Sequence, residues 1–298
     1  MRNCFSLTFM AVLFGILLAG CLESTEQYTL NPDGSGRVVV EATVTNMSAM
    51  LGLDDESDGK KDSREEVKKF VRNMIQSSSG VDAWKDITCR TAGDDRIYFK
   101  GTAYFSDFNE LEINDVSNHT FIRENTSDGG WIIRFKESES DDDEDEGAEN
   151  LTEEEITARV DSLKADYAMG RAVMEPILGG IKQSYSFTLP GTVTDRAVFN
   201  PTAKGAYELT IEGKKILAVL DSVASTDGFW REQVVATRRS AEEQKEVAIK
   251  MLFGIDGVPR LKNSGGKPLF NYKAEVNAAK KKYTAMLKPF GLKPGDVE

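Results

Sequence analysis

The sequence predicts an α+β fold, in which antiparallel β-hairpins form a sheet that packs against several helices, one of them long. Short alternating segments are separated by turns rich in glycine, asparagine and aspartate, which is typical of hairpins. Two helix starts carry capping boxes, and one of them opens an apolar seam of about seven turns. The composition, 40% hydrophobic and 29% charged, is that of an ordinary globular protein.

The N-terminal segment has the pattern of an export signal. Arg2 precedes an almost unbroken apolar run, Phe5–Leu18, which is too short for a membrane span and ends in small residues. The ending Leu18-Ala19-Gly20-Cys21 resembles the lipobox of bacterial lipoproteins. That resemblance implies cleavage between Gly20 and Cys21 and acylation of Cys21, as with palmitate. An ordinary secretory signal is the alternative. We therefore expect a signal peptide over residues 1–20, then a segment over 21–27 that consists of the lipidated Cys21 and a short polar tether, Leu22–Gln27.

The resemblance also implies a location. Leu22, and not Asp, follows the cysteine, and in Gram-negative lipoproteins this favours the outer membrane, facing the periplasm. Cys89 would then be the one unmodified cysteine of the mature chain, so we expect no internal disulfide.

Three hairpins are predicted in the first half of the chain. Residues 28–30 pair with 37–45 across a turn that holds Pro32, Gly34 and Gly36. Residues 87–91 pair with 97–105, and residues 119–125 pair with 131–136. A helix begins at Ser63, with Glu66 completing the capping box, and carries an apolar stripe that includes Phe70 and Met74.

The longest helix is predicted to begin at Thr152, which forms a capping box with Glu155. Its apolar residues recur with 4-3 spacing and predict one seam: Ile156, Val160, Leu163, Tyr167, Gly170, Met174 and Ile177. We expect this seam to pack on the protein's own sheet, and a coiled-coil partner is the alternative.

Extended segments follow over 183–189, 193–200 and 206–211, and a helix over 214–223. The stretch Phe187-Thr188-Leu189-Pro190-Gly191-Thr192-Val193, together with the lipobox and the first hairpin, resembles LppM-type envelope lipoproteins. The match covers about a quarter of the chain. It implies an α+β envelope domain that handles lipids, and it provides no catalytic residues.

The chain is predicted to divide into an α+β domain over 28–225, with acidic loops at 54–62 and 137–150, and a helical, basic part over 226–298. Within the latter we expect helices from Ser240 to Leu252 and along the stripe Tyr272, Val276, Ala279, Tyr283 and Leu287, separated by a loop over 254–267. Residues 228–298 hold 14 basic and 8 acidic side chains. This basic end either folds on the acidic part, faces anionic headgroups or is a solvated helical face.

Charge and motifs limit the function classes. The net charge of −12 argues against a nucleic-acid partner, because binding phosphates requires basic surface. His119 is the only histidine, which excludes a multi-histidine zinc site. Neither a Gly-x-Ser-x-Gly elbow nor a phosphate-binding Gly-Lys-Ser/Thr loop is present. We predict no catalytic residues, and calcium is the one candidate cofactor.

Both acidic runs carry the carboxylate spacing of an EF-hand-like loop, in which oxygen ligands surround Ca²⁺. Both depart from the pattern, because glutamate replaces aspartate or asparagine at the third position and position eight is not aliphatic. Solvated acidic spacers are the alternative. The candidate calcium ligands are Asp54, Glu56, Asp58, Asp62 and Glu65 in the first loop and Asp142, Glu144, Glu146, Asn150 and Glu153 in the second.

These observations predict a membrane-anchored envelope lipoprotein that acts as a non-catalytic binding or structural module. The membrane, reached through the N-terminal lipid, is its expected partner. Two alternatives remain: lipid or apolar-ligand binding in an α+β cavity, and an envelope-polymer hydrolase that uses unmarked carboxylates.

Overall fold

The protein is described from a computed structural model that places residues 21–45, 63–92, 96–113, 121–136, 151–235 and 249–296. The predicted α+β class is confirmed: helices accompany one large, mostly antiparallel sheet and a second, smaller sheet. The chain divides into two compact units, and their elements alternate along the sequence. Unit 1 takes Glu137–Ile181 and Ile211–Val258; unit 2 takes Ala19–Lys136, Lys182–Thr210 and Pro259–Glu298.

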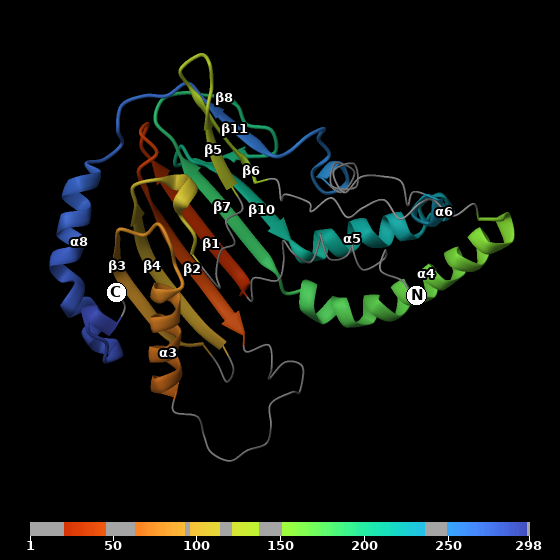
Figure 1. Ribbon diagram of the computed structural model, residues 1–298, viewed down its shortest axis with the longest axis horizontal. Coiled ribbons are helices and arrows are strands. Elements are labelled where there is room, and N and C mark those ends of the chain that lie inside the picture. Colours follow the sequence, from red (N-terminus) through yellow and green to blue (C-terminus); the bar gives the residue numbers. More distant parts are fainter. Residues whose placement is uncertain are drawn as a thin grey trace. The chain divides into compact units, whose positions relative to one another are not determined.

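Unit 2 is built on a seven-stranded sheet with the order β3-β4-β2-β1-β7-β10-β9 (Figure 1). β1 lies near the middle, antiparallel to β2 and parallel to β7. The strands are β1 (Cys21–Leu30), β2 (Gly36–Thr45), β3 (Ala83–Thr91), β4 (Arg96–Phe105), β7 (Lys182–Thr188), β9 (Asn200–Pro201) and β10 (Tyr207–Glu212).

The first predicted hairpin is confirmed, since β1 and β2 pair from Leu30 opposite Gly36. The tether predicted over 22–27 is wrong. These residues continue β1, and Glu23 is already aligned with Thr43 of β2 and with Lys182 of β7. The pattern hid this strand because two side chains on its buried face, Ser24 and Glu26, are polar.

One face of the sheet forms the core of unit 2. Its fully buried side chains include Leu30, Val38, Val40, Phe99 and Phe187. Each contributes about 1.5–3 kcal/mol by leaving water. On this face Phe70 of α3 (Ser63–Gln76) packs on Phe99, with ring centroids 6.0 Å apart, which confirms the predicted helix and its stripe. The predicted β3–β4 hairpin is also confirmed.

A second sheet has the order β5-β6-β11-β8, formed by β5 (Phe121–Asn125), β6 (Trp131–Phe135), β8 (Val193–Asp195) and β11 (Arg260–Asn263). Phe121 of β5 packs edge-on against Phe187 of the large sheet at 5.1 Å. The β5–β6 hairpin is as predicted. The expectation of a loop throughout 254–267 is wrong, because β11 lies within it and pairs with both β6 and β8.

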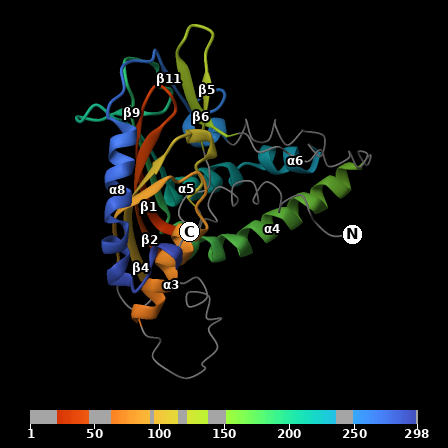
Figure 2. The same ribbon diagram turned by 60° about the vertical axis from the view of Figure 1, so that its left-hand side comes forward.

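Helix α8 (Tyr272–Leu287) runs alongside the β3 edge of the large sheet (Figures 1 and 2). Val276, Ala279 and Leu287 of the predicted stripe are buried, and Val276 and Ala279 pack against Ala83 and Tyr104. Short 3₁₀ turns are η1 (Phe108–Glu110), η2 (Lys288–Phe290) and η3 (Pro294–Asp296). Most of the helix predicted over 240–252 lies outside the described residues. Its described end is helical, over 249–253.

Unit 1 contains α4 (Glu153–Leu178), α5 (Gly213–Ala224) and α6 (Asp227–Val235). The capping box of Thr152 and Glu155 is present, as predicted. The seam finds a different partner from the predicted sheet: Ile156 and Val160 pack against Trp230 and Val234 of α6. In the part of the chain that is described, no helix has both the length and the apolarity needed to span a membrane.

Candidate functional site

The start of β1 joins the predicted lipid attachment point directly to the large sheet. Cys21 is the first residue of the strand and is aligned with Val44, whereas Gly20 lies outside the described residues. From Glu23 to Thr29 every residue of β1 has a partner on both sides, in β2 and in β7. Any group attached to Cys21 is therefore attached to a central strand of the fold.

The core side of β1 holds a buried carboxylate. Glu26 is fully buried, and its Oε2 accepts a hydrogen bond of 2.5 Å from the Tyr28 hydroxyl. Gln183 and Tyr185 of β7 are buried beside it, in register with Ser24 and Glu26. Glu26 is the one buried carboxylate among the residues that the structure describes. A buried polar group is costly unless it is hydrogen-bonded, so the Tyr28 contact stabilises the Glu26 side chain.

The opposite side of β1 and β7 carries a regular array of polar side chains, which we call the hydroxyl face. In-register pairs are Thr25 with Ser184, Gln27 with Ser186, and Thr29 with Thr188. Thr210 of β10 extends the array, because its hydroxyl lies 3.1 Å from that of Ser184. The members of the hydroxyl face are Thr25, Gln27, Thr29, Ser184, Ser186, Thr188 and Thr210.

This array is regular and partly accessible. Neighbouring strands lie about 4.8 Å apart, and side chains on one face of a strand repeat about every 6.7 Å. Gln27 is exposed and the hydroxyl groups, apart from that of Ser184, are half-buried. A hydroxyl can both donate and accept a hydrogen bond, so Thr25, Thr29, Ser186 and Thr188 offer both functions to a ligand, whereas Ser184 and Thr210 are already bonded within the sheet.

The charges around the hydroxyl face are largely paired. Glu41 of β2 accepts hydrogen bonds from Lys100 (2.9 Å) and Tyr98 (2.8 Å) of β4. The Lys100 contact, followed by that of Tyr98, lowers the pKa of Glu41 and keeps it ionised. At the Cys21 end, Glu23 and Lys182 are cross-strand neighbours of opposite sign. Glu208 of β10 adds a carboxylate beside Thr210, whose hydroxyl donates to it at 3.3 Å. The surface around the hydroxyl face is thus polar, with this carboxylate in addition to the paired charges.

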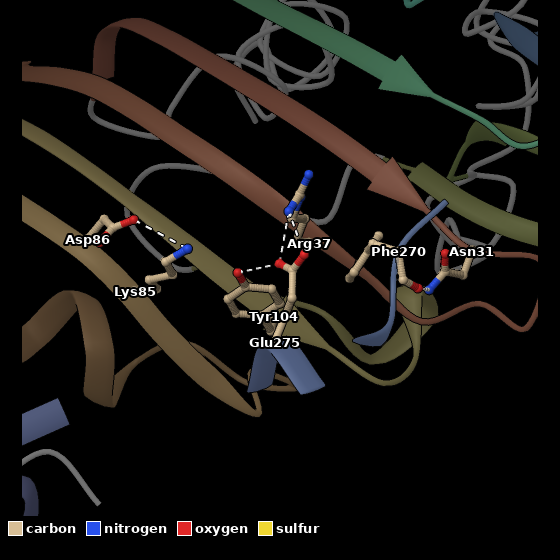
Figure 3. A network of polar contacts seen from close by, with 7 residues as sticks. All are labelled: Asn31, Arg37, Lys85, Asp86, Tyr104, Phe270 and Glu275. Atoms are coloured by element: carbon tan, nitrogen blue, oxygen red, sulfur yellow. Dashed lines mark hydrogen bonds and ion pairs between the residues drawn. The ribbon is translucent and has the colours of Figure 1, made fainter. Parts of the chain in front are cut away.

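The other half of the same sheet face is covered by α8 through a polar clamp (Figure 3). Glu275 of α8 lies between Arg37 and Tyr104, accepting from the Arg37 guanidinium at 2.9 Å and from the Tyr104 hydroxyl at 2.7 Å. The Arg37 guanidinium also lies over the Phe270 ring, 4.8 Å from its centroid. Burial, and then the bond to Glu275, raises the pKa of Tyr104 to about 12.

A second tie holds the segment that precedes α8. Asn31 donates to the Phe270 carbonyl at 3.3 Å, and its Oδ1 accepts from the Leu269 backbone N–H at 2.9 Å. Asn31 is almost fully buried. In the same view Lys85 and Asp86 form a separate ion pair on β3 (Figure 3).

Eight of the predicted calcium ligands lie outside the described residues: Asp54, Glu56, Asp58, Asp62, Asp142, Glu144, Glu146 and Asn150. The other two are in the first turns of different helices. Glu65 of α3 pairs with Lys68, and Glu153 of α4 pairs with Arg231. Within the described ranges, no group of three or more His, Cys, Asp or Glu side chains could hold a metal ion. The calcium prediction stays a prediction.

Of the other singled-out residues, His119 lies outside the described residues. Cys89 of β3 is half-buried, and burial raises the pKa of its thiol to about 12, so it is a neutral thiol at physiological pH.

The residues of the hydroxyl face were not predicted as a site. Thr25 and Ser184 are more than 150 positions apart, and only the parallel β1–β7 pairing brings them together. The signal that could have found them is the alternation of Ser and Thr at 184, 186 and 188, opposite the buried Phe187.

Comparison with known protein families, with curated proteins and with solved structures found no match for this chain.

Proposed function

We propose that this chain is a lipid-anchored, non-catalytic binding module of the bacterial cell envelope and that the hydroxyl face takes a neutral glycan. Lipid at Cys21 would hold it on the outer membrane, facing the periplasm. The observation that carries the proposal is the in-register array of hydroxyl and amide groups on β1 and β7, the first of which begins at the lipidation residue.

The ligand class follows from the chemistry of the face. A glycan chain presents hydroxyl groups along its length, which need partners that both donate and accept. A charged polymer would need opposite charge, but the nearby cations Lys100 and Arg37 are already bound to Glu41 and Glu275. A neutral, hydroxyl-rich polymer therefore suits this surface better than an anionic one.

The anchor is tested by Cys21→Ser in the full-length protein. The serine variant should lose lipid processing and move from the membrane to the soluble fraction, because stable attachment needs acyl chains. A serine variant that is processed like the parent and fractionates with membranes would overturn the anchor.

Binding is tested by cosedimentation of the detergent-solubilised protein with insoluble chitin, a neutral acetylated glycan, and with covalently cross-linked alginate beads, an anionic one. Replacing both Gln27 and Ser186 by Ala removes two hydrogen bonds of about 0.5–1.5 kcal/mol each. Chitin binding should then weaken by about tenfold, since that factor corresponds to about 1.4 kcal/mol.

Thr88→Ala, on β3 and outside the hydroxyl face, is the matched control and should leave chitin binding unchanged. Equal retention of the parent on alginate and chitin would contradict the neutral-ligand assignment. An unchanged affinity of the double variant for chitin would contradict the assignment of the face.

A further inference from the structure

The link between Cys21 and the large sheet is too short to act as a tether. A single residue, Leu22, separates Cys21 from Glu23, which is aligned with partners in both β2 and β7. An extended chain advances at most about 3.6 Å per residue, so this link spans about 7 Å. That only matches the depth of the headgroup region on one side of a bilayer, about 5–8 Å, so the link leaves no length for a gap between the sheet and the headgroups.

The link cannot lengthen by peeling β1 from the sheet. Separation of the strand end would break its pairing with two neighbours and expose Ser24 and Glu26, which are buried on the core side. It would also strip the fully buried Glu26 of its packed surroundings beside Tyr28. Since peeling would break the backbone hydrogen bonds to two neighbouring strands together with the bond between Glu26 and Tyr28, the native sheet keeps β1 in place.

Several side chains share this end of the sheet with Cys21. Lys182 begins β7 and is aligned with Glu23, while Arg96 begins β4 and is aligned with Thr45, one position beyond the partner of Cys21. Lys182 and Arg96 are both exposed. With a strand spacing of about 4.8 Å, they lie about one and two strands away from β1.

We infer that the Cys21 end of the seven-stranded sheet is a membrane-contact surface, with Lys182 and Arg96 at the phospholipid headgroups. This inference rests on the proposed lipidation of Cys21 and goes beyond it, because an anchored protein on a tether would leave the sheet in solution. Arg96, whose cross-strand partner Thr45 is uncharged, suits the phosphates of the headgroup layer, and Lys182 adds a cation beside the exposed carboxylate of Glu23.

The test uses the full-length, lipidated protein in vesicles of phosphatidylcholine and phosphatidylglycerol that contain a headgroup-nitroxide lipid. A fluorophore is placed at Lys182→Cys, at Arg96→Cys or at Lys204→Cys, each in a Cys89→Ser background. Lys204 is an exposed residue of the turn before β10. Thr210 of β10 lies beside Ser184, and Gly213 next to β10 bonds to Ile181 next to β7. From Thr210 the strand runs away from Lys182 for about 10 Å to Tyr207, and Lys204 lies in the turn beyond it, at the opposite end of the sheet.

Quenching by the nitroxide should be severalfold stronger at positions 182 and 96 than at position 204. Equal quenching at all three positions on vesicle-bound protein would overturn this inference and leave the anchor intact. Failure of the parent to bind vesicles would overturn both.

A matched variant carries a flexible Gly-Ser segment between Leu22 and Glu23. It keeps the lipid and the paired part of β1 but adds the tether that the native chain lacks. Vesicle binding should persist, and quenching at position 182 should fall to the level of position 204. Unchanged quenching at position 182 would show that the short link does not hold this end at the membrane, which overturns the inference.

Discussion

One face of the large sheet is divided into two halves that differ in their cover. Over β3 and β4, Ala83 and Tyr104 lie beneath Val276 and Ala279 of α8. Over β1 and β7, the hydroxyl face lies on the same side of the same sheet, and Gln27 at its centre is exposed. The strand register shows that the two halves lie on one face, because Arg37 of β2 is aligned with Tyr104 of β4 on one side and with Thr29 of β1 on the other.

The difference teaches that side-chain chemistry, and not strand geometry, decides where a helix docks. Burying the Tyr104 ring under α8 removes apolar surface from water, and Glu275 accepts a hydrogen bond from the hydroxyl that is buried with the ring. Serine and threonine hydroxyls gain little from being covered by an apolar helix face and would lose water as a partner. The half that α8 leaves open is thus suited to bind polar ligands.

Of the changes considered, Tyr104→Ala in the covered half should lower the free energy of unfolding most. It deletes a ring that is 1% exposed and packed on α8, together with the hydroxyl bond to Glu275. We expect the free energy of unfolding to fall by about 3–5 kcal/mol, as for other large aromatic truncations. Urea denaturation followed by circular dichroism measures this loss. A loss below about 1 kcal/mol would mean that α8 adds little to the stability of unit 2.

Local signals account for much of the fold that the sequence predicted. The turn through Pro32 and Gly36 determines the first hairpin, and Thr152 with Glu155 determines where α4 begins. Both depend on residues that are neighbours in sequence. The partner of the α4 seam was predicted wrongly, since its apolar spacing specifies a buried stripe without specifying that α6 covers it.

Long-range pairing accounts for what was missed. The parallel β1–β7 ladder joins Glu23 to Lys182, and no local pattern encodes such a register. The polar residues Ser24 and Glu26 made the start of β1 resemble a tether, although both are buried. β11 was missed because it is only four residues long and lies between glycine-rich loops. The hydroxyl face exists only through this pairing, so sequence alone could not predict it.

The second-largest effect should come from high pH, which lowers the free energy of unfolding by ionising Tyr104 in the covered half. Burial, and then the bond to Glu275, raises the pKa of Tyr104 from 10.0 to about 12 in the folded protein. The folded state therefore holds this proton more tightly than the unfolded state does. The associated stability is complete below pH 10 and is lost as the pH rises towards 12.

Urea denaturation over this range should show a steeper loss of stability in the parent than in Tyr104→Phe, which has no phenol to ionise. The variant should retain part of the slope, because the pKa values of Tyr98 and Tyr272 are also raised by burial. Identical slopes would mean that Tyr104 ionises as it does in an unfolded chain.

Glu275→Gln should weaken the clamp by a smaller amount. The amide keeps the size of the side chain and can still accept from the Tyr104 hydroxyl, but the ion pair with Arg37 is lost. Both side chains of the pair are about one-third exposed, so solvent screens their attraction. We expect a loss of about 1 kcal/mol in the free energy of unfolding, measured by thermal denaturation, and no change in chitin binding. A loss as large as that of Tyr104→Ala would show that charge, rather than ring burial, holds α8.

Thr29→Ala should have the smallest effect on stability and sharpens the comparison most. Thr29 lies on the open half, half-buried beside Thr188, and its substitution removes a hydroxyl and a methyl group without opening a core cavity. Alanine has a lower strand propensity than threonine, so a loss of about 0.5 kcal/mol is expected. The same substitution should reduce retention on chitin, because one member of the array is gone.

Denaturation and cosedimentation on the same preparation separate these effects. A destabilisation above about 2 kcal/mol would indicate that the open half is covered in the native protein. The hydroxyl face would then belong to the core, and the contrast with the half beneath α8 would disappear.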